Sequence, residues 1–207
     1  PIYISHDRGE TWQDVTLEWI VPVEGALDHY LSYNDAKLLE FDGYLWAALE
    51  YTIVRSPDNG RTWGFVLPQH GSLHFPTAWL LHNNRIYVAA EYYGGETAYF
   101  GRYENGLSHP LVQGLPPHPP PPWAYIEALV SHNGRIFAAV RRRGVYVFNE
   151  RSETWSFVGL NGADVDSLVS HQSELYAVTD EGVYRAAIRT VTLHGKALTI
   201  WGAIKQK

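Results

Sequence analysis

Three consecutive arginines, Arg141, Arg142 and Arg143, form an unusual basic run in a chain whose formal net charge is −6 at pH 7. A guanidinium group presents a planar fork of donors that fits carboxylate, sulfate or phosphate groups. The run therefore predicts recognition of an anionic group. The alternative is a solvated turn whose charges keep strand edges from pairing with other chains.

Three carboxylates, Glu127, Asp164 and Asp166, lie near the starts of two predicted strands. Glu127 and Asp166 occupy equivalent positions of the repeat described below. A pair of carboxyl groups in one site can perform acid–base catalysis or bind a cation. The alternative is that they are solvated carboxylates of loops or of a central channel. They are the candidate catalytic residues, and the sequence alone assigns none of them a role.

Aromatic residues in the same predicted loops are candidates for ligand contact, because loops on a rigid scaffold often carry binding residues. They are Tyr51, Tyr92, Tyr93, Trp123 and Tyr125. Trp123 ends the segment LPPHPPPPW (115–123), which predicts an extended polyproline loop. We expect this loop to be a rigid connector on the binding face; a ligand for a proline-recognition domain is the alternative.

The elements that position these residues form a repeat. An apolar strand, a polar two-residue turn and a second strand recur at 38–49, 79–90, 128–140 and 167–179. Turns such as Asn133-Gly134 are strong hairpin signals because both residues tolerate positive φ. A third strand follows each hairpin and a fourth follows most of them, which gives four short strands per ~40 residues.

This pattern predicts an all-β fold of the β-propeller type, in which four-stranded blades pack face to face around an axis. A β-sandwich is the alternative, but it would not repeat its own sequence. We expect one domain over residues 1–207. Its repeats are a half repeat at 1–27 and full repeats at 28–71, 72–120, 121–162 and 163–207.

The half repeat leaves open how the ring of blades closes, because residues 1–17 match only the third and fourth strands of a repeat. Residues 189–204 either add an outer strand to the last repeat or supply the two missing strands. We favour the second arrangement, since it closes a ring of about five blades and leaves no exposed edge. A 4.5-blade portion of a larger propeller would instead fit a start at Pro1 without any Met. Closure between chains would give an oligomer.

Two segments, 5–12 and 56–63, share the pattern S-x-D-x-G-x-T-W. The pattern resembles the Asp box of the sialidase-like BNR repeat, a β-propeller family. The resemblance implies a turn between the third and fourth strands, on the face away from the binding site, with the tryptophans packed between sheets. The structural residues are Ser5, Asp7, Gly9, Thr11, Trp12, Ser56, Asp58, Gly60, Thr62 and Trp63. A third copy at 148–155 keeps Thr154 and Trp155 but has lost the Asp and the Gly.

The sialidases of this family use three arginines on separate blades, a Tyr–Glu pair and an acidic Asp. That set has no counterpart in this sequence, and the Arg-Ile-Pro signature of those enzymes is absent. We therefore expect a non-enzymatic binding or scaffolding propeller that recognises a glycan or a protein partner through its loop face. A sialidase-like glycoside hydrolase is the first alternative. An assembly factor for a membrane complex is the second, because photosystem II assembly factors resemble this repeat.

The charge and composition of the sequence exclude several kinds of partner and binding site. The acidic balance argues against nucleic acid, and the apolar runs are too short to span a membrane. The absence of Cys excludes disulfides and thiolate zinc sites. The ten His show no metal-binding spacing; His82, His132 and His171 recur just before a hairpin turn, which indicates a structural hydrogen bond. We expect no metal, no cofactor and an extracellular or periplasmic location.

Overall fold

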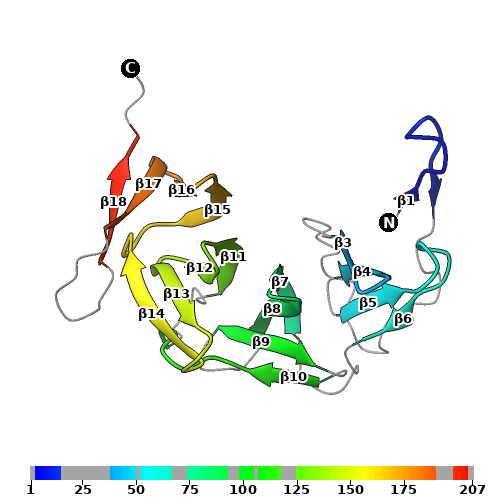
Figure 1. The fold of residues 1–207 in the computed structure, drawn as a ribbon, viewed down its shortest axis with the longest axis horizontal. Coiled ribbons are helices and arrows are strands. Elements are labelled where there is room, and N and C mark those ends of the chain that lie inside the picture. The colour runs from blue at the N-terminus through cyan, green and yellow to red at the C-terminus, as the bar shows by residue number, and fades with distance from the viewer. Residues whose placement is uncertain are drawn as a thin grey trace. The chain divides into compact units, whose positions relative to one another are not determined.

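The computed structural model describes residues 3–14, 38–49, 52–66, 74–92, 98–104, 107–117, 125–189 and 198–204. All regular elements in these ranges are β-strands (Figure 1). Nowhere in the described part of the chain is there a helix long and apolar enough to cross a membrane. The chain divides into two compact units, an N-terminal unit, Pro1–Gln69, and a C-terminal unit, His70–Lys207.

The N-terminal unit holds a two-stranded and a four-stranded antiparallel sheet. The strands of the small sheet are β1 (Tyr3–Ile4) and β2 (Gln13–Asp14). The larger sheet has the strand order β3–β4–β5–β6. Its strands are β3 (Leu38–Phe41), β4 (Tyr44–Leu49), β5 (Thr52–Ser56) and β6 (Gly64–Phe65).

The C-terminal unit holds three four-stranded antiparallel sheets, each built from four consecutive strands. The first contains β7 (His74–His82), β8 (Arg85–Tyr92), β9 (Tyr99–Glu104) and β10 (Leu107–Pro110). The second contains β11 (Ile126–His132), β12 (Arg135–Val140), β13 (Gly144–Asn149) and β14 (Thr154–Gly159). The third contains β15 (Val165–His171), β16 (Glu174–Thr179), β17 (Gly182–Arg189) and β18 (Leu198–Ala203).

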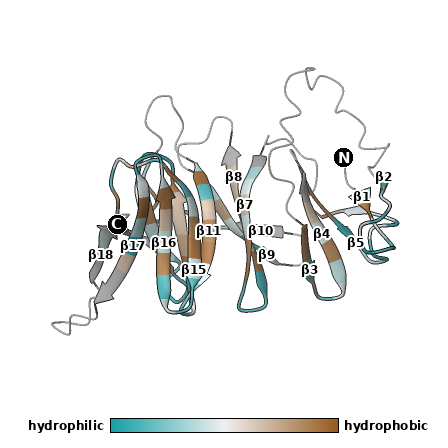
Figure 2. Ribbon diagram, turned by 90° about the horizontal axis from the view of Figure 1, so that it is seen from above, coloured by the Kyte–Doolittle hydropathy of each residue, from teal (hydrophilic) through white to brown (hydrophobic). Residues whose placement is uncertain are grey.

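The four predicted hairpins are confirmed as β3–β4, β7–β8, β11–β12 and β15–β16. Their turns use the polar pairs that the sequence indicated. Asn133 and Gly134, for example, have φ values of 49° and 72°, in the left-handed region that Asn and Gly tolerate well. Figure 2 shows that hydrophilic residues collect at the turns and apolar residues along the strands.

The β11–β14 sheet contributes to two hydrophobic cores, one on each face. Toward the β7–β10 sheet, the ring of Trp155 lies 4.8 Å from that of Phe100 and 5.0 Å from that of Phe148. Toward the β15–β18 sheet, Phe137 and Leu175 belong to a second core. Because successive residues of a strand point to opposite faces, alternate apolar residues of one sheet bind it to both neighbours.

The prediction that residues 189–204 complete the half repeat is wrong. β18 pairs with β17 from Tyr184↔Ala203 to Arg189↔Leu198 and forms the fourth strand of the last sheet. The side chain of Trp201 packs against the second core, and its indole Nε1 donates to the carbonyl oxygen of Val158 at 3.2 Å. This aromatic anchor on the neighbouring sheet explains why β18 stays with its own repeat.

The two S-x-D-x-G-x-T-W segments fold into matching hydrogen-bonded turns. In residues 56–63, the Ser56 hydroxyl donates to Asp58 at 2.8 Å and accepts from the Gly60 N–H at 2.7 Å. Asp58 accepts from both the N–H and the hydroxyl of Thr62 at 2.7 Å, and the Trp63 indole donates to the Gly60 carbonyl at 3.0 Å. Residues 5–12 repeat this set of bonds.

The two turns differ in what their tryptophans contact. Trp63 is 5% exposed and packs with Ala47 and Val54. Trp12 is 63% exposed, so the expectation that it packs between sheets is wrong for the described residues. The hydrogen bonds of the turn therefore form whether or not the indole is buried.

The carboxylate of this turn gives a pH prediction. The hydroxyl and N–H of Thr62, with help from Ser56, hold the pKa of Asp58 at about 2, below its ordinary 3.8. A lowered folded-state pKa contributes stability that is present above the ordinary pKa and is lost as the pH falls through the folded value. We expect Asp58→Asn to reduce stability at pH 5 and to flatten the loss between about pH 4 and about pH 2.

Chemical denaturation at a series of pH values measures this effect. Asp42→Asn is the matched control, because Asp42 lies in the β3–β4 turn with φ 53°, where Asn is equally tolerated. It should keep the wild-type acid dependence. An Asp58→Asn variant with an unchanged acid dependence would contradict the stabilising role of the carboxylate.

Candidate functional site

The first strand of each sheet in the C-terminal unit, β7, β11 or β15, carries a β-bulge at the same repeat position. The register shifts lie between Pro76 and Ala78, Ile126 and Ala128, and Val165 and Ser167. The bulged residues are therefore Thr77, Glu127 and Asp166. A bulge re-aims the side chain of its extra residue and is common beside binding sites. The two carboxylates that the repeat placed at equivalent positions are thus presented by a shared backbone irregularity.

The β12–β13 turn lies at the same end of the strands as these bulges. The N–H of Arg141 donates to the carbonyl of Tyr125 at 2.9 Å, and the N–H of Arg143 donates to Val140 at 2.9 Å. Arg142 has φ 54°. At Gly144, with φ 84°, a Cβ would collide with the carbonyl oxygens of Gly159 and Leu160. From this tight turn, Arg141 and Arg142 both reach Asp164.

Arg141 links the turn to both neighbouring strand starts. Its guanidinium donates to the Tyr125 hydroxyl and lies 5.0 Å from the centre of the Tyr125 ring. Its Nε lies 3.7 Å from Oε1 of Glu127 and 4.0 Å from Oδ1 of Asp164. The Nε of Arg142 lies 3.4 Å from Oδ2 of the same aspartate. We call Tyr125, Glu127, Arg141, Arg142, Asp164 and Asp166 the Arg141 cluster.

The electrostatics of the cluster centre on Glu127. Burial raises the pKa of this carboxyl, and the negative charges of Asp166 and Asp164 raise it further. The positive charge of Arg141 and the hydrogen bond from Tyr125 oppose the increase without cancelling it. A carboxyl in this setting retains its proton to higher pH than an exposed glutamate.

The net charge of the Arg141 cluster indicates what kind of ligand it can bind. Three carboxylates, Glu127, Asp164 and Asp166, face two guanidinium groups, Arg141 and Arg142. With all five ionised, the sum is −1. The carboxylates therefore compensate the positive charge that the sequence offered to an anion. Donors and acceptors for a neutral polar ligand remain.

The other predicted ligand-binding residues divide into two groups. Arg143 is half-buried near Tyr146, and among the described residues it forms no ion pair. Tyr92 ends β8, but its side chain lies outside the described part of the structure, as do Tyr51, Tyr93 and Trp123 in full. Of the sequence candidates, the structure brings together the members of the Arg141 cluster.

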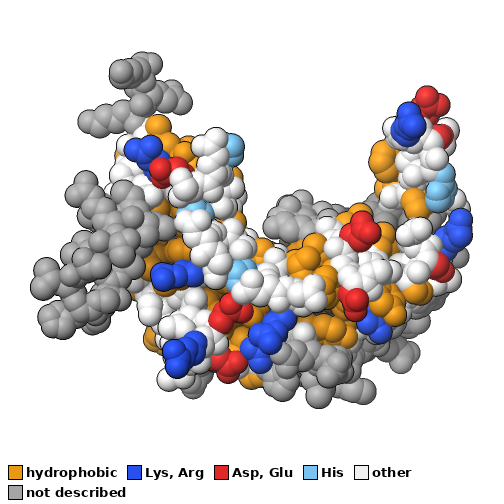
Figure 3. Space-filling model, in the orientation of Figure 1, with side chains coloured by type: hydrophobic (Ala, Val, Ile, Leu, Met, Phe, Trp, Pro, Cys, Tyr) orange, Lys and Arg blue, Asp and Glu red, His pale blue; other side chains and the backbone are white. Residues whose placement is uncertain are grey.

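The recurring histidines lie at the other end of the strands, and two of them, His82 and His132, join neighbouring sheets. Nδ1 of His82 lies 2.7 Å from Oγ of Ser131, and Nδ1 of His132 lies 2.9 Å from Oγ of Ser170. The prediction of structural hydrogen bonds is confirmed for these two buried histidines. Figure 3 shows histidine side chains, in pale blue, on the face of the molecule that it views.

Glu150 belongs to the same end and was not singled out from the sequence. It accepts from the Tyr87 hydroxyl at 2.8 Å and from the Asn83 amide at 2.9 Å, and it lies 3.3 Å from Nε2 of His82. Within the ranges that the structure describes, no group of three or more His, Asp or Glu side chains is arranged to hold a metal ion.

Comparison with known proteins shows the fold alone. No family model and no curated protein matches the chain. The extracellular domain of a one-component system from B. thetaiotaomicron is similar at 15% identity and a TM-score of 0.56, over 75% of this chain and 22% of that one. The designed protein Ika4 is similar at 14% identity and a TM-score of 0.51, over 77% of this chain and 94% of that one.

A second designed protein, Ika8, is similar at 15% identity and a TM-score of 0.50, over 78% of this chain and 46% of that one. The chain thus spans about a fifth of the length of the bacterial extracellular domain and less than half of Ika8. At such identities the likeness extends to the arrangement of strands and to no shared chemistry.

Proposed function

We propose that the chain is a non-enzymatic binding module of the β-propeller type, and that the Arg141 cluster binds a neutral, hydroxyl-rich ligand of the glycan class. The observation that carries the proposal is the convergence of Tyr125, Arg141 and Asp164 with the bulged residue Glu127 at one end of two adjacent sheets. Tyr125 and Glu127 lie at the start of β11, Arg141 comes from the β12–β13 turn, and Asp164 directly precedes β15.

The polar groups of the cluster suit sugar hydroxyls. Each hydroxyl both donates and accepts, and carboxylate oxygens accept while guanidinium groups donate. Arg141 already lies within 4.0 Å of two carboxylates, so a hydroxyl inserted between them meets an acceptor and a donor at once. An anion would instead have to displace a carboxylate from the guanidinium, and that exchange returns little free energy.

The repeated sheets and turns support our proposal that the chain is an Asp-box β-propeller. Four four-stranded sheets and two identically bonded turns support membership of the sialidase-like Asp-box propellers. We propose that the chain forms a propeller of about five blades or a 4.5-blade portion of a larger propeller. Likeness to a domain that is itself extracellular is consistent with an extracellular or periplasmic location.

Glycoside hydrolysis is the second candidate function, because one specific observation favours it. Burial raises the pKa of Glu127 beside Asp164 and Asp166. A carboxyl that keeps its proton can act as general acid, while a neighbouring ionised carboxylate acts as base or nucleophile. If this candidate is correct, fluorogenic glycosides are cleaved and Glu127→Gln abolishes the cleavage.

A glycan array tests the binding function. We expect labelled chain to be retained by a related set of neutral glycans. Because no net ionic contact is needed, retention should change less than about twofold between about 0.05 M and about 0.5 M NaCl. Retention only by sulfated or sialylated glycans, with steep salt dependence, would replace the proposal with anion recognition. Retention by none, or cleavage of the printed glycans, would contradict it.

A further inference from the structure

The β15–β18 sheet has one covered and one open face in the C-terminal unit. Leu168, Leu175 and Ala177 point toward the β11–β14 sheet and belong to the core between the two sheets. The opposite face is defined by the strand register, which pairs Val169 with Tyr176 and Val178 with Val183. Figure 1 shows this sheet last in the series of three.

The open face holds the side-chain types that neighbouring sheets bury. Val145 and Ala139 of the β11–β14 sheet are both 0% exposed, because the β15–β18 sheet covers them. At the same repeat positions, Val183 is 40% exposed and Val178 is 36% exposed. The open face is therefore a continuation of an established interface, with apolar residues at positions that this fold normally covers.

The apolar residues of this face form a patch. Five large apolar side chains are exposed among the described residues of the C-terminal unit, and Phe157 is the only one away from this face. The other four are Val169, Val178, Val183 and Ile204. Ile204 belongs with them because its N–H bonds to the Val183 carbonyl. Contiguous apolar surface of this kind marks a contact with another macromolecule.

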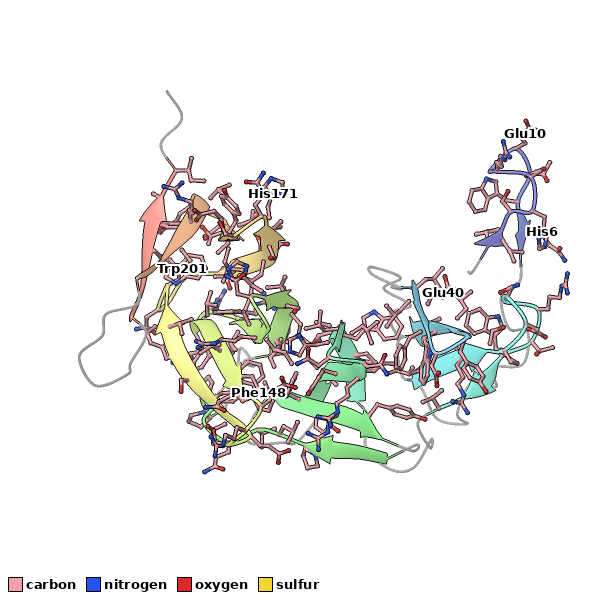
Figure 4. The ribbon with its side chains drawn as sticks, in the orientation of Figure 1. His6, Glu10, Glu40, Phe148, His171 and Trp201 are labelled. Atoms are coloured by element: carbon pink, nitrogen blue, oxygen red, sulfur yellow. The ribbon has the colours of Figure 1, made fainter. Side chains whose placement is uncertain are left out.

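Polar groups flank the patch. Arg185 and Glu174 lie on the same face, 4.0 Å apart; the side chain of Arg185 is 58% exposed and that of Glu174 is 40% exposed. His171, at the end of β15 (Figure 4), occupies the repeat position of His132. His132 is 1% exposed and bonds to Ser170 of the next sheet, whereas His171 is exposed. The patch thus has one cation and one anion available to a partner.

We propose that the open face of the β15–β18 sheet is the contact surface for a second copy of this chain. Two sheets pack face to face as readily between chains as within one, with inward side chains interdigitating. A two-fold arrangement brings each patch against itself. Since the patch carries both Arg185 and Glu174, the two-fold axis can place each arginine opposite the glutamate of the other copy. This proposal is independent of the glycan site.

Sedimentation velocity over a range of concentrations tests the proposal. We expect a reversible dimer of the 207-residue chain. Val178→Glu should weaken dimerisation by at least about a hundredfold, because the new carboxylate would be buried against an apolar surface. The exposure of Val178 means that the fold of the variant should persist, as circular dichroism can verify. Phe157→Ser, at an exposed site on β14, should leave the dimer intact.

A charge exchange gives a second readout. Arg185→Glu alone should weaken the dimer, and Arg185→Glu combined with Glu174→Arg should restore it. A wild-type chain that stays monomeric at all concentrations would overturn the proposal, as would a dimer unaffected by Val178→Glu. A monomer that loses folding stability on Val178→Glu would also overturn it, because the face would then be covered within one chain.

Discussion

Replacing Trp63 with alanine is expected to lower the free energy of unfolding by about 3–5 kcal/mol, whereas Trp12→Ala should change it by less than about 0.5 kcal/mol. The two indoles make the same hydrogen bond, to the carbonyl of Gly60 or Gly9. They differ in burial, since Trp63 is 5% and Trp12 is 63% exposed. The contrast therefore isolates the packing of the side chain from the bonding of the turn.

Urea denaturation of the wild type and the two variants, followed by circular dichroism, measures this difference. Trp12→Ala serves as the internal control for loss of the indole hydrogen bond. Equal destabilisation by both substitutions would show that the turn bond dominates and that burial of Trp63 contributes little. A small effect of both would contradict the core around Ala47 and Val54.

The repeated sheets could be predicted because their signals are local. Each hairpin combines alternating apolar residues with a polar turn pair, and both features act over about ten residues. The Asn133-Gly134 and Asp42-Gly43 turns take the positive φ values that their residue types favour. The third and fourth strands follow from the same alternation, so even the β9–β10 pair, which lacks the S-x-D-x-G-x-T-W turn, forms a full sheet.

The pairing of the last strand could not be predicted in this way. Residues 198–203 are apolar enough to join any sheet, and strand periodicity gives no information about the partner. The choice depends on a tertiary contact, the packing of Trp201 on the second core with its indole bonded to Val158. The sequence held one signal for this choice: Trp201 occupies the repeat position of Trp63 and Trp155.

The site was predicted in part. The repeat placed Glu127 and Asp166 at equivalent positions, and the structure shows both at β-bulges. The bulges themselves depend on the register between strands, which residue types do not specify. The sequence predicts either an anion site or a solvated turn for the three arginines, but the bond between the Arg141 N–H and the Tyr125 carbonyl places the Arg141 side chain among carboxylates.

Glu150 shows how a degenerate motif changes its role. It stands at the position of Asp58, but Asn149 takes over the turn by accepting from the N–H groups of Arg151 and Ser152. The carboxylate of Glu150 is thereby released to bind Tyr87 on the neighbouring sheet. The signal for this second role was an acidic residue kept at the Asp position of a copy that has lost the Ser and the Gly of the motif.

The central claim is that the Arg141 cluster binds a glycan, and the effect of Arg141→Ala on affinity tests it most directly. Arg141 contacts Tyr125 and lies beside Glu127 and Asp164, so its removal takes away a charged donor and leaves Arg142 to face the three carboxylates of the cluster. Loss of a hydrogen bond to a charged group corresponds to about 10- to 100-fold in Kd.

Isothermal titration with a glycan retained on the array gives the measurement, and Arg143→Ala is the matched control on the same turn. Arg143 is half-buried beside Tyr146 and, among the described residues, forms no ion pair. We predict a 10- to 100-fold weaker Kd for Arg141→Ala, by about the amount a charged hydrogen bond supplies, and a change below about twofold for Arg143→Ala. Wild-type affinity in Arg141→Ala, or equal losses in both variants, would contradict the claim.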